Sequence, residues 1–125
     1  MSNLFTRLLN ERDFLLADGA LGTNLFSMGL QTGDAPELWN IDHPERIADL
    51  AQQFIDAGSD ILLTNSFGGT CFRLKLHNAE QRVHELNHAA ARILKQKADA
   101  CERDIIVAGS MGPTGEIFAP TGTLT

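Results

Sequence analysis

Short apolar runs alternate with amphipathic stretches along the 125-residue chain. Three runs, at 14–17, 61–63 and 105–108, are apolar along their length and are followed by polar or small residues, as strands buried on both faces are. Between them, apolar residues recur at helical spacing over 44–58 and 78–101. Because each pair of strands is joined through a helix, the order predicts parallel strands in consecutive βαβ units.

The predicted helices carry boundary signals. Pro44 stands in the first turn of one helix and Gly58 follows its last turn. Asn78 with Gln81 resembles a capping box, which predicts that the second helix begins there. A short amphipathic turn over 4–9 precedes the first strand.

The spacing of the strands favours a barrel. The predicted strands begin at 14, 61 and 105, so they are 47 and 44 residues apart, against about 31 residues per unit in a 250-residue barrel. The excess falls in the loops after the strands, where barrel enzymes carry their chemistry. The sequence predicts the first three parallel strands, with their helices, of an incomplete (β/α)8 TIM barrel. Continuous apolar strands need cover on both faces of the sheet, and the predicted elements of this chain cannot supply it. We therefore expect residues 1–125 to form the N-terminal part of that domain.

Composition narrows the partners and the compartment. A net charge of −6 and a pI near 5.0 argue against nucleic acid and anionic membranes, which attract clustered Lys and Arg. The charged N-terminus over 1–12 has neither a signal-peptide core nor a membrane span. The two cysteines, Cys71 and Cys101, form neither a CxxC pair nor a disulfide framework. This suits a reducing cytoplasm and argues against a self-contained zinc site. We therefore expect both cysteines to be packing residues.

Small or polar residues follow each predicted strand. In a parallel α/β fold these strand ends meet at one rim, where ligands bind. Each group alone is also explained by turn formation, but three groups in phase favour a site. The groups are Asp18-Gly19, Thr64-Asn65-Ser66 and Ser110.

Three other features have two interpretations each. His84 and His88 match the zinc-protease pattern H-E-x-x-H. However, with Val83 taken as 0° around the helix axis, His84 and His88 lie at about 100° and 140°, whereas the apolar stripe centres at about 330°. The two histidines therefore point away from the core, which favours a solvated helix face. The glycines of D-G-A-L-G-T at 18–23 form either a phosphate cradle or a tight turn beside a small ligand; no helical stripe follows them at once, which favours the turn. Trp39 is either a lid over a ligand or cover for the rim.

Together the motifs resemble the homocysteine S-methyltransferase domain. The family's D-G-A-x-G-T is matched at 18–23, its A-G-[SA]-D at 57–60, its T-N-[ST]-F-G at 64–68 and its G-S-x-G-P-T-G at 109–115. The resemblance runs from residue 14 to 125 in order. This domain is shared by betaine–homocysteine methyltransferases and the N-terminal module of cobalamin-dependent methionine synthases.

The resemblance implies an enzyme that transfers a methyl group to the thiol of homocysteine and forms methionine. Zinc, held by three cysteine thiolates that lie beyond residue 125, would hold the homocysteine sulfur as a thiolate, the attacking nucleophile. The run at 24–40 looks most like bacterial betaine-type members, so betaine is favoured over methyltetrahydrofolate acting through cobalamin. A homo-oligomer is compatible with the resemblance, and the 125-residue chain alone is expected to be inactive.

By position, the resemblance assigns homocysteine binding to five residues and no catalytic or metal-binding residue to this chain. A carboxylate can pair with the substrate ammonium, and a backbone N–H and a hydroxyl can bind its carboxylate. The competing hypothesis is a non-catalytic α/β binding module that needs a partner to cover its sheet. The five residues are Asp18, Gly19, Thr64, Asn65 and Ser66.

Overall fold

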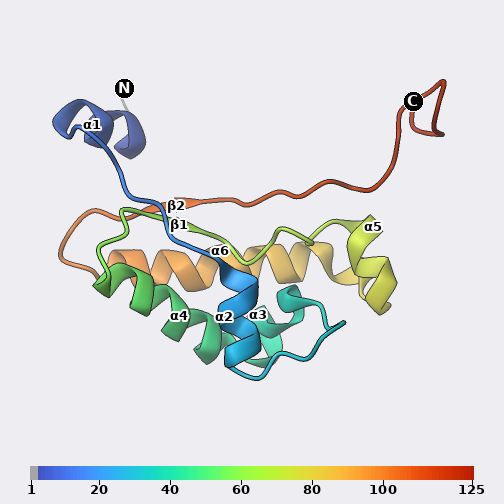
Figure 1. The fold of residues 1–125 in the computed structure, drawn as a ribbon, viewed down its shortest axis with the longest axis horizontal. Helices are drawn as coiled ribbons and strands as arrows, with labels where there is room; N and C mark the ends of the chain where they lie inside the picture. The colour runs from blue at the N-terminus through green and yellow to red at the C-terminus, as the bar shows by residue number, and fades with distance from the viewer. Residues whose placement is uncertain (1–2) are drawn as a thin grey trace.

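A computed structural model describes residues 3–125. This part contains six α-helices, two strands and three short 3-10 turns (Figure 1). The helices are α1 (Leu4–Glu11), α2 (Leu21–Ser27), α3 (Trp39–Asp42), α4 (Pro44–Asp56), α5 (Cys71–Leu74) and α6 (Val83–Asp99), and the strands are β1 (Ile61–Leu63) and β2 (Ile106–Ala108). The 3-10 turns are η1 (Pro36–Leu38), η2 (Lys75–His77) and η3 (Glu80–Arg82).

The sheet is parallel, as the sequence predicts. β1 pairs with β2, and Leu62 lies opposite Val107. On the other edge of β1, Ala17 forms a single parallel bridge to Ile61, so the segment 14–17 continues the sheet without becoming a regular strand. The strands predicted at 61–63 and 105–108 are confirmed.

The prediction that the segment 14–17 is a buried strand is wrong in two respects. The segment has only one bridge, and Phe14 is 75% exposed and Leu16 48% exposed. The reason is that the helices cover the opposite face of the sheet, and no described residue packs over this one enough to bury them.

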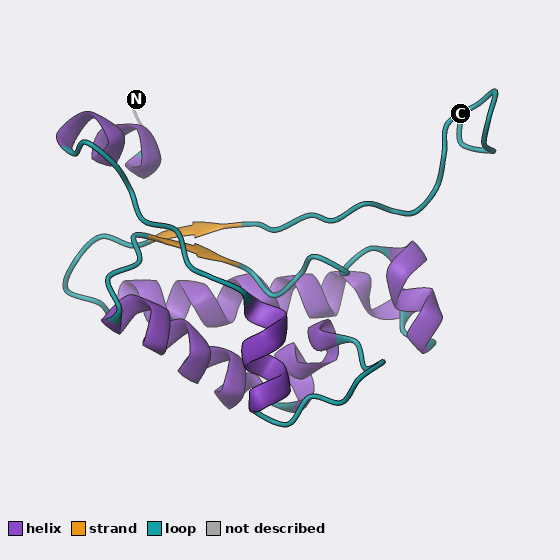
Figure 2. Ribbon diagram, viewed as in Figure 1, coloured by secondary structure: helices purple, strands orange, loops and turns teal. Residues whose placement is uncertain are grey.

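The main core lies between the sheet and the helices α4 and α6. Figure 2 shows the two strands along one side of this helical layer. Leu62 is completely buried against it, whereas its neighbour Leu63 points to the other side and is 38% exposed. Residues 3–125 therefore cover one face of the sheet and leave the other open. The buried core residues are Leu25, Leu30, Trp39, Ile47, Leu50, Ala51, Ile55, Leu62, Ile93, Leu94 and Ile105.

Helix α4 forms where the sequence predicts it. Pro44 occupies its first turn, and Gly58 follows its end with φ +102°, a left-handed conformation that favours glycine.

Helix α6 begins later than predicted. Asn78 takes a left-handed conformation after η2, and η3 intervenes before the helix starts at Val83 without a side-chain cap. The predicted capping box at Asn78 is therefore wrong.

Helix α2 is a further correction, because it begins inside the D-G-A-L-G-T motif. Its apolar side is short: Leu25 is buried in the main core, and Leu21 and Met28 pack at its margin. Ala20 precedes the helix and gives no side-chain cap. With neither a long stripe nor a capping residue, the helix leaves little signal in the sequence.

Asp60 joins three segments at the amino-terminal end of the sheet. Its carboxylate accepts hydrogen bonds from the Leu16 N–H at 3.0 Å, from Arg12 at 2.6 Å and from Arg103 at 3.3 Å. These hydrogen bonds and the neighbouring guanidinium charges hold the pKa of Asp60 below its ordinary value, against the opposing effect of burial.

None of the helices in the described part of the chain is long and apolar enough to cross a membrane.

Candidate functional site

Asp18 lies at the carboxyl end of the segment 14–17, at the edge of β1. Its Oδ2 accepts a hydrogen bond from the Leu63 N–H at 2.9 Å. Its Oδ1 is buried and has no hydrogen-bond partner among residues 3–125. Burial raises the pKa of the Asp18 carboxyl, and the hydrogen bonds from the Leu63 N–H and its own N–H offset part of that rise. Asp18 therefore offers one acceptor oxygen that the described protein does not use.

Thr64 and Ser66 fasten the end of β1 to the end of β2. The Ser110 N–H donates to Thr64 Oγ1 at 3.0 Å, and Ser66 Oγ donates to the Ser110 carbonyl at 2.8 Å. The two hydroxyls lie 2.6 Å apart. Because the Ser66 proton goes to Ser110, Thr64 is the donor between them. Both hydroxyl protons are thus used within the protein, and the two side chains fix the rim.

Asn65 connects the rim to the long loop after residue 18. Its side-chain amide donates to the Pro36 carbonyl at 2.8 Å and to Asn40 Oδ1 at 3.0 Å, and Asn40 returns a bond to the Asn65 carbonyl at 2.8 Å. Both side chains are buried. The Asn65 amide thus holds the loop in place with both of its donors.

Gly19 is exposed beside Asp18 and packs closely on helix α4. A Cβ at this position would lie 3.2 Å from the ring of Phe54. The Gly19 N–H donates to no acceptor within residues 3–125. Asp18 and Gly19 together therefore present an unused acceptor and an unused donor at the same strand end.

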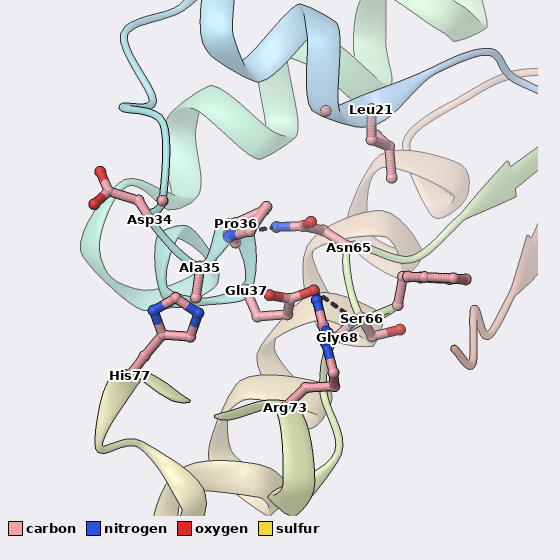
Figure 3. Close-up of a pocket in the computed structure, with 13 residues that line it drawn as sticks. Leu21, Asp34, Ala35, Pro36, Glu37, Asn65, Ser66, Gly68, Arg73 and His77 are labelled. Carbon is pink, nitrogen blue, oxygen red and sulfur yellow. Dashed lines mark hydrogen bonds between the residues drawn. The ribbon is translucent and has the colours of Figure 1, made fainter. Parts of the chain in front are cut away.

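A cleft of about 480 Å³ opens between the loop 33–37 and the segment 65–68 (Figure 3). Asn65 and Ser66 line it, whereas Asp18, Gly19 and Thr64 do not. Sequence reasoning missed four charged or titratable residues of its wall: Asp34, Glu37, Arg73 and His77. Glu37 and Leu38 lie between Pro36 and Trp39 in the sequence. No pattern in that loop indicates that the Glu37 side chain is buried.

Trp39 is a packing residue. It is buried in the main core, the guanidinium of Arg46 lies 4.6 Å from its ring centroid, and His43 contacts it edge-on. Neither of the two interpretations offered by the sequence had placed it so deeply. Cys101 packs against the same core, as expected, but Cys71 is exposed at the start of α5, so the packing role predicted for Cys71 is wrong.

The H-E-x-x-H segment lies on the outer face of α6. His84 and His88 are exposed and stack with their ring centroids 5.9 Å apart, while Glu85 pairs with Arg82. Within residues 3–125, no group of three His, Cys, Asp or Glu side chains is arranged to hold a metal ion. The described residues therefore do not fit a zinc site, and the solvated-face interpretation is confirmed.

A parallel sheet, helices between its strands and polar groups at the strand ends define part of a parallel α/β fold of the kind that binds ligands at this rim. The family model described as homocysteine S-methyltransferase matches residues 15–125, and the chain belongs to that family.

Relatives and solved structures agree with this assignment. The methionine synthase of Mycobacterium tuberculosis (strain ATCC 25618 / H37Rv) is 29% identical over an alignment of 108 residues that covers 79% of this chain and 9% of the relative. The corresponding protein of Mycobacterium leprae (strain TN) is 27% identical, again over 79% of this chain and 9% of its own length. The homocysteine methyltransferase MmuM from Escherichia coli, in its metallated form, superposes with a TM-score of 0.77 at 27% identity, over 90% of this chain and 42% of MmuM. The chain therefore spans less than half of each of these proteins.

Proposed function

We propose that this chain supplies the homocysteine-binding end of an enzyme that methylates homocysteine to methionine. The observation that carries the proposal is the buried Oδ1 of Asp18, which has no hydrogen-bond partner among residues 3–125. A buried carboxylate oxygen without a partner is costly. The ammonium of an amino acid bound at the rim would supply both the missing hydrogen bond and the missing charge.

The remaining rim residues divide into two roles. The free Gly19 N–H is suited to the carboxylate of homocysteine. The hydroxyls of Thr64 and Ser66 and the amide of Asn65 already donate within the protein, so we assign them to shaping the rim. This refines the prediction that all five residues contact the substrate.

The proposal places residues 1–125 at the N-terminal part of a (β/α)8 barrel in the cytoplasm. We call a protein in which these residues continue into the rest of the barrel the full-barrel protein. Zinc, if present as the family resemblance implies, takes its ligands from that remainder, because the described residues do not fit it. The donor in the proposal is betaine or else methyltetrahydrofolate through cobalamin. Family membership supports an enzyme over a binding module.

The test is methionine formation by the purified full-barrel protein with homocysteine and each donor in turn. We expect homocysteine-dependent turnover with betaine, and no turnover when homocysteine is omitted. Turnover only with methylated cobalamin would support homocysteine as the methyl acceptor and would replace betaine as the proposed methyl donor. A folded, zinc-loaded full-barrel protein that neither binds homocysteine in calorimetry nor forms methionine with either donor would contradict the proposal.

A further inference from the structure

Glu37 is a buried carboxylate outside the set of residues that the sequence assigns to the site. It lies in η1 and is only 6% exposed. Its Oε1 accepts a hydrogen bond from the Gly68 N–H at 2.7 Å, which Figure 3 shows as a dashed line. None of the ion pairs formed among residues 3–125 includes Glu37. The one hydrogen bond that its side chain makes within residues 3–125 is therefore to the backbone of another segment.

That hydrogen bond is the second of two between the same pair of segments. Asn65 donates to the Pro36 carbonyl at 2.8 Å, one residue before Glu37. Gly68 lies three residues after Asn65, so the segment 65–68 is attached to the loop at both of its ends (Figure 3). Ser66, which ties the rim to Ser110, stands between the two attachments.

Gly68 also packs against the Glu37 carboxylate. A Cβ on Gly68 would lie 2.8 Å from Oε1 and 3.1 Å from Cδ of Glu37. Real Cβ atoms do not approach oxygen so closely, so any side chain at this position would displace the carboxylate. The close approach explains a glycine at residue 68 without any need for an unusual backbone conformation.

From these contacts we infer that Glu37 is a positioning residue for homocysteine binding. By accepting the Gly68 N–H it fixes the segment 64–68, whose first residue lies directly after Leu63, the backbone partner of Asp18. Glu37 touches no substrate in this inference; it acts through the backbone of the segment. The inference rests on the proposed function.

Two substitutions separate the hydrogen bond from the charge. Glu37→Asp keeps the charge but is one methylene shorter, so the carboxylate no longer reaches the Gly68 N–H. Glu37→Gln removes the charge and keeps an oxygen in reach. In the full-barrel protein we expect Glu37→Asp to raise the KM for homocysteine about tenfold with kcat within about twofold, and Glu37→Gln to stay within about threefold of wild type in both. Exposed Glu102 provides the matched controls Glu102→Asp and Glu102→Gln.

Hydrogen exchange gives a readout that does not depend on activity. A peptide that includes Gly68 should exchange as slowly in Glu37→Gln as in wild type and faster in Glu37→Asp. If Glu37→Asp fails to fold, Gly68→Ala takes its place, because it displaces the carboxylate from the other side of the hydrogen bond. It should show the same faster exchange and the same raised KM that are expected of Glu37→Asp.

Two results would overturn the inference. Unchanged exchange and kinetics in Glu37→Asp would show that the hydrogen bond positions nothing, and equal damage in Glu37→Gln would show that the charge itself meets the ligand. A wild-type protein that neither binds homocysteine nor forms methionine would contradict the proposed function alone, since the exchange experiment would still decide whether Glu37 fixes the segment.

Discussion

Asp18 Oδ2 accepts the backbone N–H of Leu63 at 2.9 Å, while the Asp18 N–H donates to the Ile61 carbonyl at 2.9 Å. The side chain thus continues the hydrogen bonding to β1 one step beyond the backbone hydrogen bond that the Asp18 N–H donates. A side chain that uses one oxygen for the sheet keeps its second oxygen at the rim. The link between fold and proposed site is therefore a single carboxylate.

The raised pKa of Asp18 predicts a pH dependence of stability. The folded protein holds the Asp18 proton more tightly than the unfolded chain does. The free energy of unfolding therefore falls as the pH rises from 3.8, the ordinary pKa of an Asp carboxyl, through the raised pKa of Asp18 in the folded protein, because the buried carboxyl ionises over this range. Denaturant titrations of the full-barrel protein without ligand should show wild type losing stability relative to Asp18→Asn over that window. A difference that does not change with pH would contradict burial of the charge.

Asp60 predicts the opposite sign. Its folded pKa lies below 3.8, so its stabilisation is present above that pH and is lost as pH falls through the lowered value. In the full-barrel protein, Asp60→Ala should cost about 1–3 kcal/mol at neutral pH because it leaves the Leu16 N–H and the Arg12 guanidinium without their acceptor and removes one of the acceptors of Arg103. Asp104→Ala, which removes only the half-exposed ion pair with Arg7, should cost less than about 1 kcal/mol. Equal losses in the two variants would contradict the special position of Asp60.

The open sheet face predicts that the 125-residue chain does not melt cooperatively as a monomer. Leu16 and Leu63 expose apolar surface on that face. Replacing both with Thr, which keeps strand propensity, should reduce self-association in sedimentation equilibrium. Leu76→Thr, at a side chain that is exposed in η2 away from the sheet, is the control. A sharply melting monomer of the unmodified chain would contradict this prediction.

The absence of a three-ligand cluster within residues 3–125 predicts weak zinc binding by this chain. After dialysis, the purified chain should hold far less than one zinc per molecule, whereas the full-barrel protein should hold about one. Stoichiometric zinc on the chain that is lost in His84→Ala or His88→Ala would revive the protease interpretation of the H-E-x-x-H segment.

The sequence predicts elements best where a long periodic stripe has clear ends. Helix α4 has both, with Pro44 before it and Gly58 after it, and its limits agree with the prediction. Helix α2 has a short apolar side and no capping residue, so no pattern separates it from the loop. At Asn78 a local signal was present, but the 3-10 turns on either side place that residue outside the helix.

Burial and partners at the rim were beyond the reach of sequence patterns. The strand-end rule correctly brings Asp18 and Thr64 to one end of the sheet. It cannot show that the hydroxyl of Thr64 is already used by Ser66, since that depends on how β2 is aligned with β1. For the same reason Glu37 was missed, because its burial arises from a contact with Gly68, 31 residues away in the chain.

The most direct test of the central claim is the dissociation constant of homocysteine for wild-type and Asp18→Asn full-barrel protein, measured by calorimetry at neutral pH. A charge-assisted hydrogen bond contributes roughly 1.5–3 kcal/mol, so the account predicts binding weaker by about ten- to a hundredfold, with zinc content unchanged. Asp49→Asn, which removes an exposed carboxylate from α4, should bind like wild type. Equal homocysteine affinity in wild type and Asp18→Asn would contradict the account and remove Asp18 from the site.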